Sequence, residues 1–117
     1  MIIGNLGFFD LASRRLDWLA ARQETVAGNI ANADTPGARA QDVASFEDYL
    51  QDTGPDRRGP RVLKVDGGWD QSPDGNTISV EEQTILSTQT QADHALASRL
   101  YRKGHEMLIL AASSHGG

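Results

Sequence analysis

Three histidines, a few serines and two acidic turn sequences are the residues of this 117-residue chain that could do chemistry. His94 and His105 lie eleven residues apart. On one helix they would point the same way, but a rise of about 1.5 Å per residue separates them by about 16 Å. One metal ion cannot bridge that distance, and no other ligand pair stands nearby at metal spacing. We therefore expect no metal site, and a solvent-facing or subunit-contact role for both histidines.

The acidic turn sequences match known catalytic or calcium-binding patterns only in part. Asp34-Thr35-Pro36-Gly37 has a proline inside the Asp-Thr-Gly pattern of aspartic proteases and occurs once, whereas that chemistry needs two carboxylates. Asp74-Gly75-Asn76 is too short to supply the oxygen ligands of a calcium loop. No serine stands in a suggestive relation to a histidine. The sequence predicts no enzyme activity, no catalytic residue, no cofactor and no small-molecule substrate.

Composition narrows the function classes further. The chain has 16 acidic and 11 basic side chains, a net charge of -5, and no segment where Lys and Arg cluster, so a nucleic-acid partner is not expected. It has no cysteine, which excludes disulfides and thiolate metal sites. The N-terminal residues lack the features of a cleaved secretory signal, and no apolar run reaches the roughly 20 residues that span a membrane. A single domain over residues 1–117 with an assembly or binding role fits best.

The first element we expect is a long amphipathic helix over about residues 8–33. Apolar side chains recur there at the a and d positions of a heptad, which is typical of a seam that packs against another helix. The helix should end before Thr35-Pro36, because proline disfavours the α region for the preceding residue, and Pro36-Gly37 suits a tight turn. Asn29 and Asn32 could cap the helix or face a partner. The predicted seam on this helix comprises Phe9, Leu16, Leu19, Val26 and Ile30.

A second long helix is predicted over about residues 80–113. Ser79 followed three residues later by Glu82 is the capping-box arrangement that marks a helix start. Its apolar stripe could pair with the first helix inside one chain, or it could form a seam between subunits, and the sequence leaves both open. The stripe comprises Ile85, Ala92, Leu96, Leu100, Met107 and Leu110.

The middle of the chain is rich in Gly and Pro. We expect a loop and one short helix within residues 34–52, and an irregular segment over 53–78. A small β-hairpin could form there between residues 61–65 and 77–80. The predicted fold is mainly α, with two long terminal helices forming an antiparallel coiled-coil-like hairpin around an irregular middle.

The segment over residues 29–37 closely resembles the signature of bacterial flagellar axial proteins, the rod and hook family. The continuation Ala40-x-Asp42-Val43 is most similar to the proximal rod members of that family, and residues 74–82 and 100–108 also resemble it. Two departures are Ala38, where an aromatic is usual, and Gly104 inside the second helix. The motif residues are Asn29, Ile30, Asn32, Asp34, Thr35, Pro36 and Gly37.

The resemblance implies a structural subunit of the proximal rod. Such subunits assemble helically through paired terminal helices, connect the basal body to the distal rod and transmit torque. The partners it implies are further copies of the chain, other proximal rod proteins, and ring and export-gate components of the base. It also implies a place in the periplasmic rod, reached through the flagellar type III apparatus without a cleaved signal. A different axial rod protein, or a helical-hairpin adapter or export chaperone, is the alternative.

Overall fold

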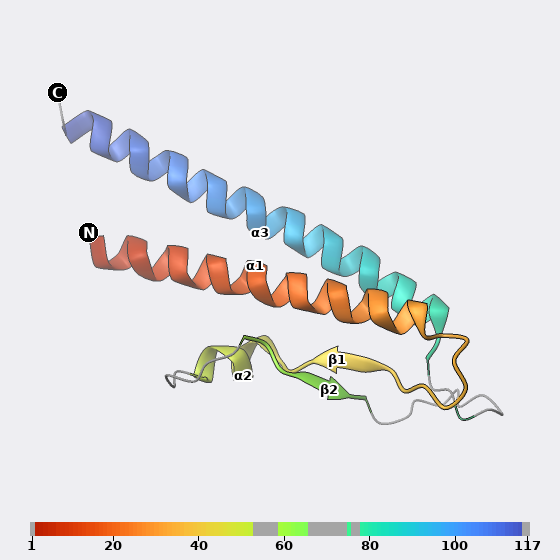
Figure 1. The fold of residues 1–117 in the computed structure, drawn as a ribbon. Helices are drawn as coiled ribbons and strands as arrows, with labels where there is room; N and C mark the ends of the chain where they lie inside the picture. The colour runs from red at the N-terminus through yellow and green to blue at the C-terminus, as the bar shows by residue number, and fades with distance from the viewer. Residues whose placement is uncertain (1, 53–58, 66–74, 76–77, 116–117) are drawn as a thin grey trace.

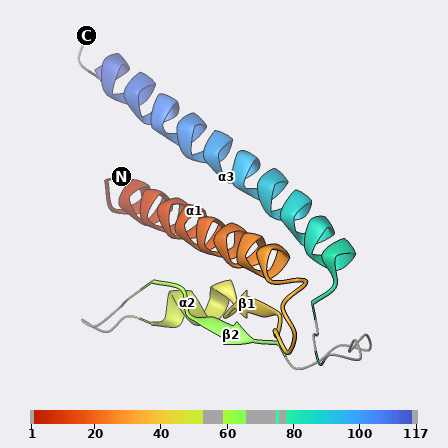
Figure 2. The same cartoon turned by 45° about the vertical axis from the view of Figure 1, so that its right-hand side comes forward.

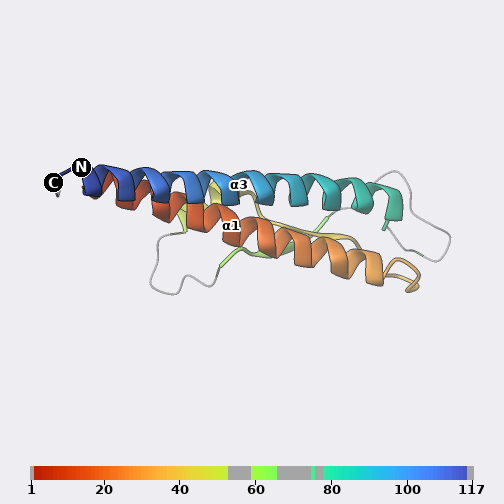
Figure 3. The same ribbon diagram turned by 90° about the horizontal axis from the view of Figure 1, so that it is seen from above.

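A computed structural model describes residues 2–52, 59–65, 75 and 78–115 of the chain. The fold is mainly helical. Helices α1 (Ile2–Ala31) and α3 (Val80–His115) lie side by side and antiparallel, so the start of α1 and the end of α3 are at the same end of the molecule (Figure 1). Seen from above, α3 lies along α1 (Figure 3). The molecule is elongated, with extents of 69 × 30 × 19 Å.

A small module occupies the other side of α1. It consists of strand β1 (Gln41–Val43), helix α2 (Phe46–Gln51) and strand β2 (Val62–Lys64), and it lies on the side of α1 that faces away from α3 (Figures 1 and 2). Helix α1 is therefore the middle of three layers. None of the helices in the described part of the chain is long and apolar enough to cross a membrane.

The helix boundaries differ a little from those predicted. Helix α1 begins at Ile2 rather than near residue 8. The helix continues through Gly4 and Gly7 because a single glycine lowers helix stability by only about 1 kcal/mol relative to alanine. The Ser79 hydroxyl accepts a hydrogen bond from the backbone N–H of Glu82 at 3.3 Å, which confirms the predicted cap. The predicted short helix is also present, as α2.

The two-stranded sheet is present, but its pairing was predicted wrongly. Strand β2 pairs antiparallel with β1, with Asp42 opposite Leu63. The predicted partner, residues 77–80, is no strand where it is described, because Ile78 and Ser79 are irregular and Val80 begins α3; residue 77 lies outside the described residues. The reason is that a strand of three residues carries little pattern, so its partner is decided by packing against α1 rather than by a nearby turn.

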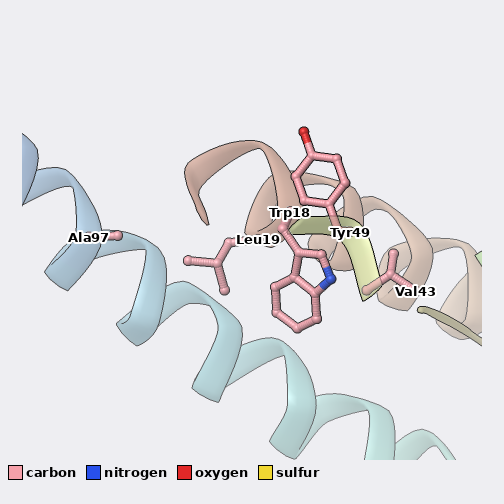
Figure 4. Close-up of a cluster of buried hydrophobic side chains, with 5 residues drawn as sticks. All are labelled: Trp18, Leu19, Val43, Tyr49 and Ala97. Atoms are coloured by element: carbon pink, nitrogen blue, oxygen red, sulfur yellow. The ribbon is translucent and has the colours of Figure 1, made fainter. Parts of the chain in front are cut away.

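The core lies where the three layers meet. Figure 4 shows Trp18 beside Val43 and Tyr49 of the small module, and Leu19 between this group and the helix that carries Ala97. The Trp18 indole N–H donates to the Ala44 carbonyl at 2.7 Å, so the ring is both buried and hydrogen-bonded. Trp18 and Leu19 are adjacent on α1 but pack in different directions, Trp18 on the small module and Leu19 toward α3. One turn of α1 thus contacts both of the other layers.

Gly104 lies beneath the aromatic ring of Phe8. A Cβ atom at this position would stand 2.5 Å from Cε1 of Phe8, whereas one at Gly28 would meet nothing within 4 Å. The family departure at Gly104 therefore has a packing reason.

We expect Gly28→Ala to raise the free energy of unfolding by up to about 1 kcal/mol through helix propensity. We expect Gly104→Ala to give no gain or a net loss, because overpacking costs about 1–3 kcal/mol. Thermal unfolding followed by circular dichroism compares the two variants. Equal stabilisation by both would show that Phe8 does not pack closely on Gly104.

Candidate functional site

Asn29 connects three elements through its side-chain amide. Its Nδ2 donates to the Gln41 carbonyl and to Oε1 of Gln83, each at 2.8 Å, and its Oδ1 accepts from the Gln41 N–H at 3.0 Å. Asn29 is 4% exposed and Gln83 is 5% exposed, so the bond between them is shielded from water, while the two bonds to Gln41 are partly buried. One amide therefore joins α1 to β1 and to α3.

The bonds to Gln41 have the pattern of a neighbouring strand. The Ala44 N–H bonds to the Arg61 carbonyl and the Val65 N–H to the Ala40 carbonyl, so even-numbered residues of this stretch face β2. The N–H and C=O of Gln41 consequently point to the other edge of β1. The Asn29 amide pairs with both groups there, as a peptide of a third strand would. The motif asparagine thus closes an edge of the sheet.

The rest of the motif forms the turn that leaves α1. Asn32 caps the helix end, since its backbone N–H and its Nδ2 both donate to the Gly28 carbonyl, at 3.0 and 3.1 Å. The Ala38 N–H then donates to the Thr35 carbonyl at 3.1 Å, and Gly37 has φ +75°. Proline followed by glycine at positive φ, closed by this bond, is a type II turn. The predicted tight turn is confirmed, and Asp34 and Pro36 lie exposed on it.

A stack of cations and aromatic rings holds the small module on α1. The Arg15 guanidinium lies 4.9 Å from the ring centroids of both Trp18 and Phe46. Arg22 lies 5.4 Å from the Trp18 centroid and pairs with the Asp42 carboxylate at 3.3 Å. Our sequence reasoning missed this stack, because it searched α1 for a single apolar stripe. The signal that could have revealed it was a tryptophan flanked by arginines at helical spacing.

The predicted seam residues of α1 fall into two groups. Leu19 and Val26 are each 1% exposed, and Phe9 and Leu16 are half-buried. Phe9 makes edge contacts with Tyr101 and His105 of α3, at ring-centroid distances of 5.3 and 6.1 Å. These four residues lie on or near the face that meets the rest of the chain. Ile30, by contrast, is exposed near the end of α1.

The predicted stripe of α3 lies mostly to the side of the contact with α1, although Leu100 and Met107 border a recess with Phe9. Ile85, Leu96, Leu100, Met107 and Leu110 are 54–70% exposed, and Ala92 is exposed as well. Within one chain, the pairing of the two predicted stripes is therefore not what the structure shows. The stripe instead forms an exposed apolar face along the side of α3.

A different face of α3 packs on α1, and besides Tyr101 its most buried residues are small or polar. Gln83, Thr90, Ala97 and Gly104 recur every seven residues, and the first three are buried. Gln23 of α1 adds a hydrogen bond from its Nε2 to Ser87 Oγ at 2.9 Å. The predicted seam was built from large apolar side chains. In the structure, small residues of α3 let the two helices approach, and the large side chains of the stripe lie on the outside. The signal that the prediction missed was a small or polar residue at every seventh position of this helix.

His94 and His105 lie in different surroundings on α3. His105 lies against Phe9, while His94 borders a recess between α1 and α3 with Ala95 and Thr90. Among the residues that the structure describes, no three His, Asp or Glu side chains are grouped closely enough to hold a metal ion. The described part of the chain therefore presents two features suited to function, the Asn29 junction and the exposed face of α3.

Comparison with known proteins gives these features a context. A family model described as flagella basal body rod protein matches residues 9–39, a stretch that contains most of α1, Asn29 itself and the turn. The flagellar basal body rod protein FlgB of Agrobacterium fabrum is 32% identical over 120 residues, covering 87% of this chain and 90% of that protein. The resemblance of residues 29–37 to flagellar axial proteins is thereby confirmed, and the chain belongs to the flagellar basal body rod protein family.

Proposed function

We propose that this chain is a structural subunit of the proximal rod, where copies assemble helically through their terminal helices. The rod built this way connects the basal body to the distal rod and transmits torque. Its neighbours are copies of itself, other proximal rod proteins, and ring and export-gate components of the base. The chain reaches the periplasmic rod through the flagellar type III apparatus without a cleaved signal.

The observation that carries the proposal is the exposed apolar face of α3. The five large apolar side chains of the predicted stripe on α3 are each more than half exposed. A contiguous exposed apolar patch on a protein marks a surface that another molecule covers. Burying one Leu, Ile or Met side chain contributes about 1.5–3 kcal/mol, so covering this face would strongly favour association.

The arrangement of the two terminal helices also supports a role as an assembling rod subunit. Helices α1 and α3 run antiparallel over most of an elongated molecule, so the exposed face extends along its length (Figure 1). Stacked copies could then bury the face continuously, as neighbouring repeats of a solenoid do. The small module lies on the far side of α1, where it leaves α3 free (Figure 2).

Mass spectrometry of purified hook-basal bodies tests the proposal. The particles should come from cells that make the chain at its native level, and proteins of the hook and the rings serve as internal references. We expect the chain at a constant ratio to those references from one preparation to the next. Its absence from intact particles, with the chain left soluble in the cytoplasm, would overturn the proposal and favour the adapter or chaperone alternative.

A further inference from the structure

A groove runs between α1 and α3 on the flank away from the exposed apolar face of α3. It encloses about 470 Å³ between Leu19–Ala27 of α1 and Thr90–Ala95 of α3. Three alanines, Ala20, Ala27 and Ala95, line it, and all three are exposed. Between the larger side chains that line the groove, these alanines leave room for large side chains from another helix.

The exposed face of α3 presents such side chains as a ridge. Leu96 and Leu100 are 55% and 54% exposed and lie one turn apart. Because each helical residue advances about 100° around the axis, Leu96 lies well over 90° from Gln91 and His94, which line the groove. The ridge and the groove are therefore on different flanks of the same helix and cannot meet within one chain.

We propose that Leu96 and Leu100 of one copy dock into the alanine groove of a second copy. This inference rests on the proposed function, since it identifies the surfaces by which neighbouring subunits meet. Copies stacked in a rod point the same way, and α3 is antiparallel to α1 within each copy. Helix α3 of the neighbour therefore runs antiparallel to the α1 that it meets, so Leu96 opposite Ala27 brings Leu100 opposite Gln23 and Lys103 opposite Ala20.

Charges on the two surfaces are complementary. Glu24 borders the groove and Asp17 lies exposed seven residues before it, while Arg99 and Lys103 lie exposed three residues after Leu96 and Leu100. The ion pairs within the described part of the chain involve none of these four. In the antiparallel arrangement Arg99 meets Glu24 and Lys103 meets Asp17. Such pairs on the rim of an interface set its register and suppress wrong partners.

The two surfaces are different, and this decides the kind of assembly. When the ridge of one copy enters the groove of the next, the first copy keeps an unused groove and the second keeps an unused ridge. Such a head-to-tail contact is heterologous, and unless the rotation closes a ring, it continues into an open helix. A ridge packed on a ridge would instead form a closed pair.

Cysteine cross-linking tests the contact, because the natural chain contains no cysteine. The variants are Ala27→Cys, Leu96→Cys and the double variant, each made in place of the natural chain. Hook-basal bodies are isolated, treated with a mild oxidant and separated on a non-reducing gel. We expect the double variant to give a ladder of dimers, trimers and larger products, and each single variant to remain monomeric. Ala20→Cys with Lys103→Cys repeats the test two turns further along if the first pair is not incorporated.

The other outcomes overturn the inference. A dimer from Leu96→Cys alone would show a ridge-to-ridge contact. A product that joins this chain to a different axial protein would show that another partner fills the groove. Monomer from both double variants, with the chain present in normal amount, would place the subunit contact elsewhere and leave the proposed function standing. Absence of the natural chain from the particles would overturn the proposed function itself, and the inference with it.

Discussion

Replacing Asn29 by Asp is expected to lower the free energy of unfolding by about 2–4 kcal/mol, because the buried Gln83 oxygen and the partly buried Gln41 carbonyl lose their donor and each such loss costs about 1–3 kcal/mol. The carboxylate keeps an acceptor for the Gln41 N–H but cannot donate to the Gln41 carbonyl or to Gln83. It would also place a charge at a site that is 4% exposed, where an unpaired charge is unfavourable.

Asn32→Asp is the matched control for this prediction. It makes the same chemical change three residues later in the same motif, at an exposed position where the amide donates to the Gly28 carbonyl at 3.1 Å. We expect its cost to stay below about 1 kcal/mol, since a solvated polar group can exchange that bond for one with water. Urea unfolding followed by circular dichroism measures both variants. Equal costs would show that the Asn29 junction does not hold the three elements together.

The contrast between these two asparagines shows how far local sequence reasoning extends. The end of α1, the turn at Pro36-Gly37 and the cap at Ser79 were all predictable, because each depends on a few adjacent residues. The capping role of Asn32 is of the same kind. The bonds of Asn29 reach residues 12 and 54 positions away, so nothing in the neighbouring sequence reveals them.

The faces of α3 show a second limit. A helical projection identifies which side chains share a side of the helix, and Ile85, Leu96 and Leu100 do share one. It does not say which side meets another part of the same chain. Here the side with Thr90 and Ala97 packs on α1, because close approach of two helices favours small residues over large ones. The resulting exposure of the leucines is a property of the three-layer arrangement and could be seen only in the structure.

Two substitutions of leucine by aspartate separate folding from assembly. Leu19→Asp is expected to abolish incorporation into the rod, and the structure gives the reason. Leu19 is 1% exposed in the cluster with Trp18 and Ala97, so a carboxylate there would be buried without a partner. Losing the packing of a buried leucine costs about 2–5 kcal/mol before the charge is counted. We therefore expect the purified variant to show a greatly reduced helical signal in circular dichroism.

Leu96→Asp makes the same change on the exposed face of α3, where the side chain is 55% exposed. An aspartate at this position meets water in the isolated chain, so the helical signal and the unfolding midpoint should stay within the small range typical of surface substitutions, about 0.5 kcal/mol. In the assembled rod the same carboxylate would be covered by a neighbour, and its desolvation would oppose association. We expect this variant to fold normally, to be missing from purified hook-basal bodies and to leave cells non-motile. Normal incorporation of Leu96→Asp would show that this part of the face stays in contact with solvent. A folding defect equal to that of Leu19→Asp would show instead that Leu96 belongs to the core. The two variants together assign one leucine to the stability of the subunit and the other to the contact between subunits.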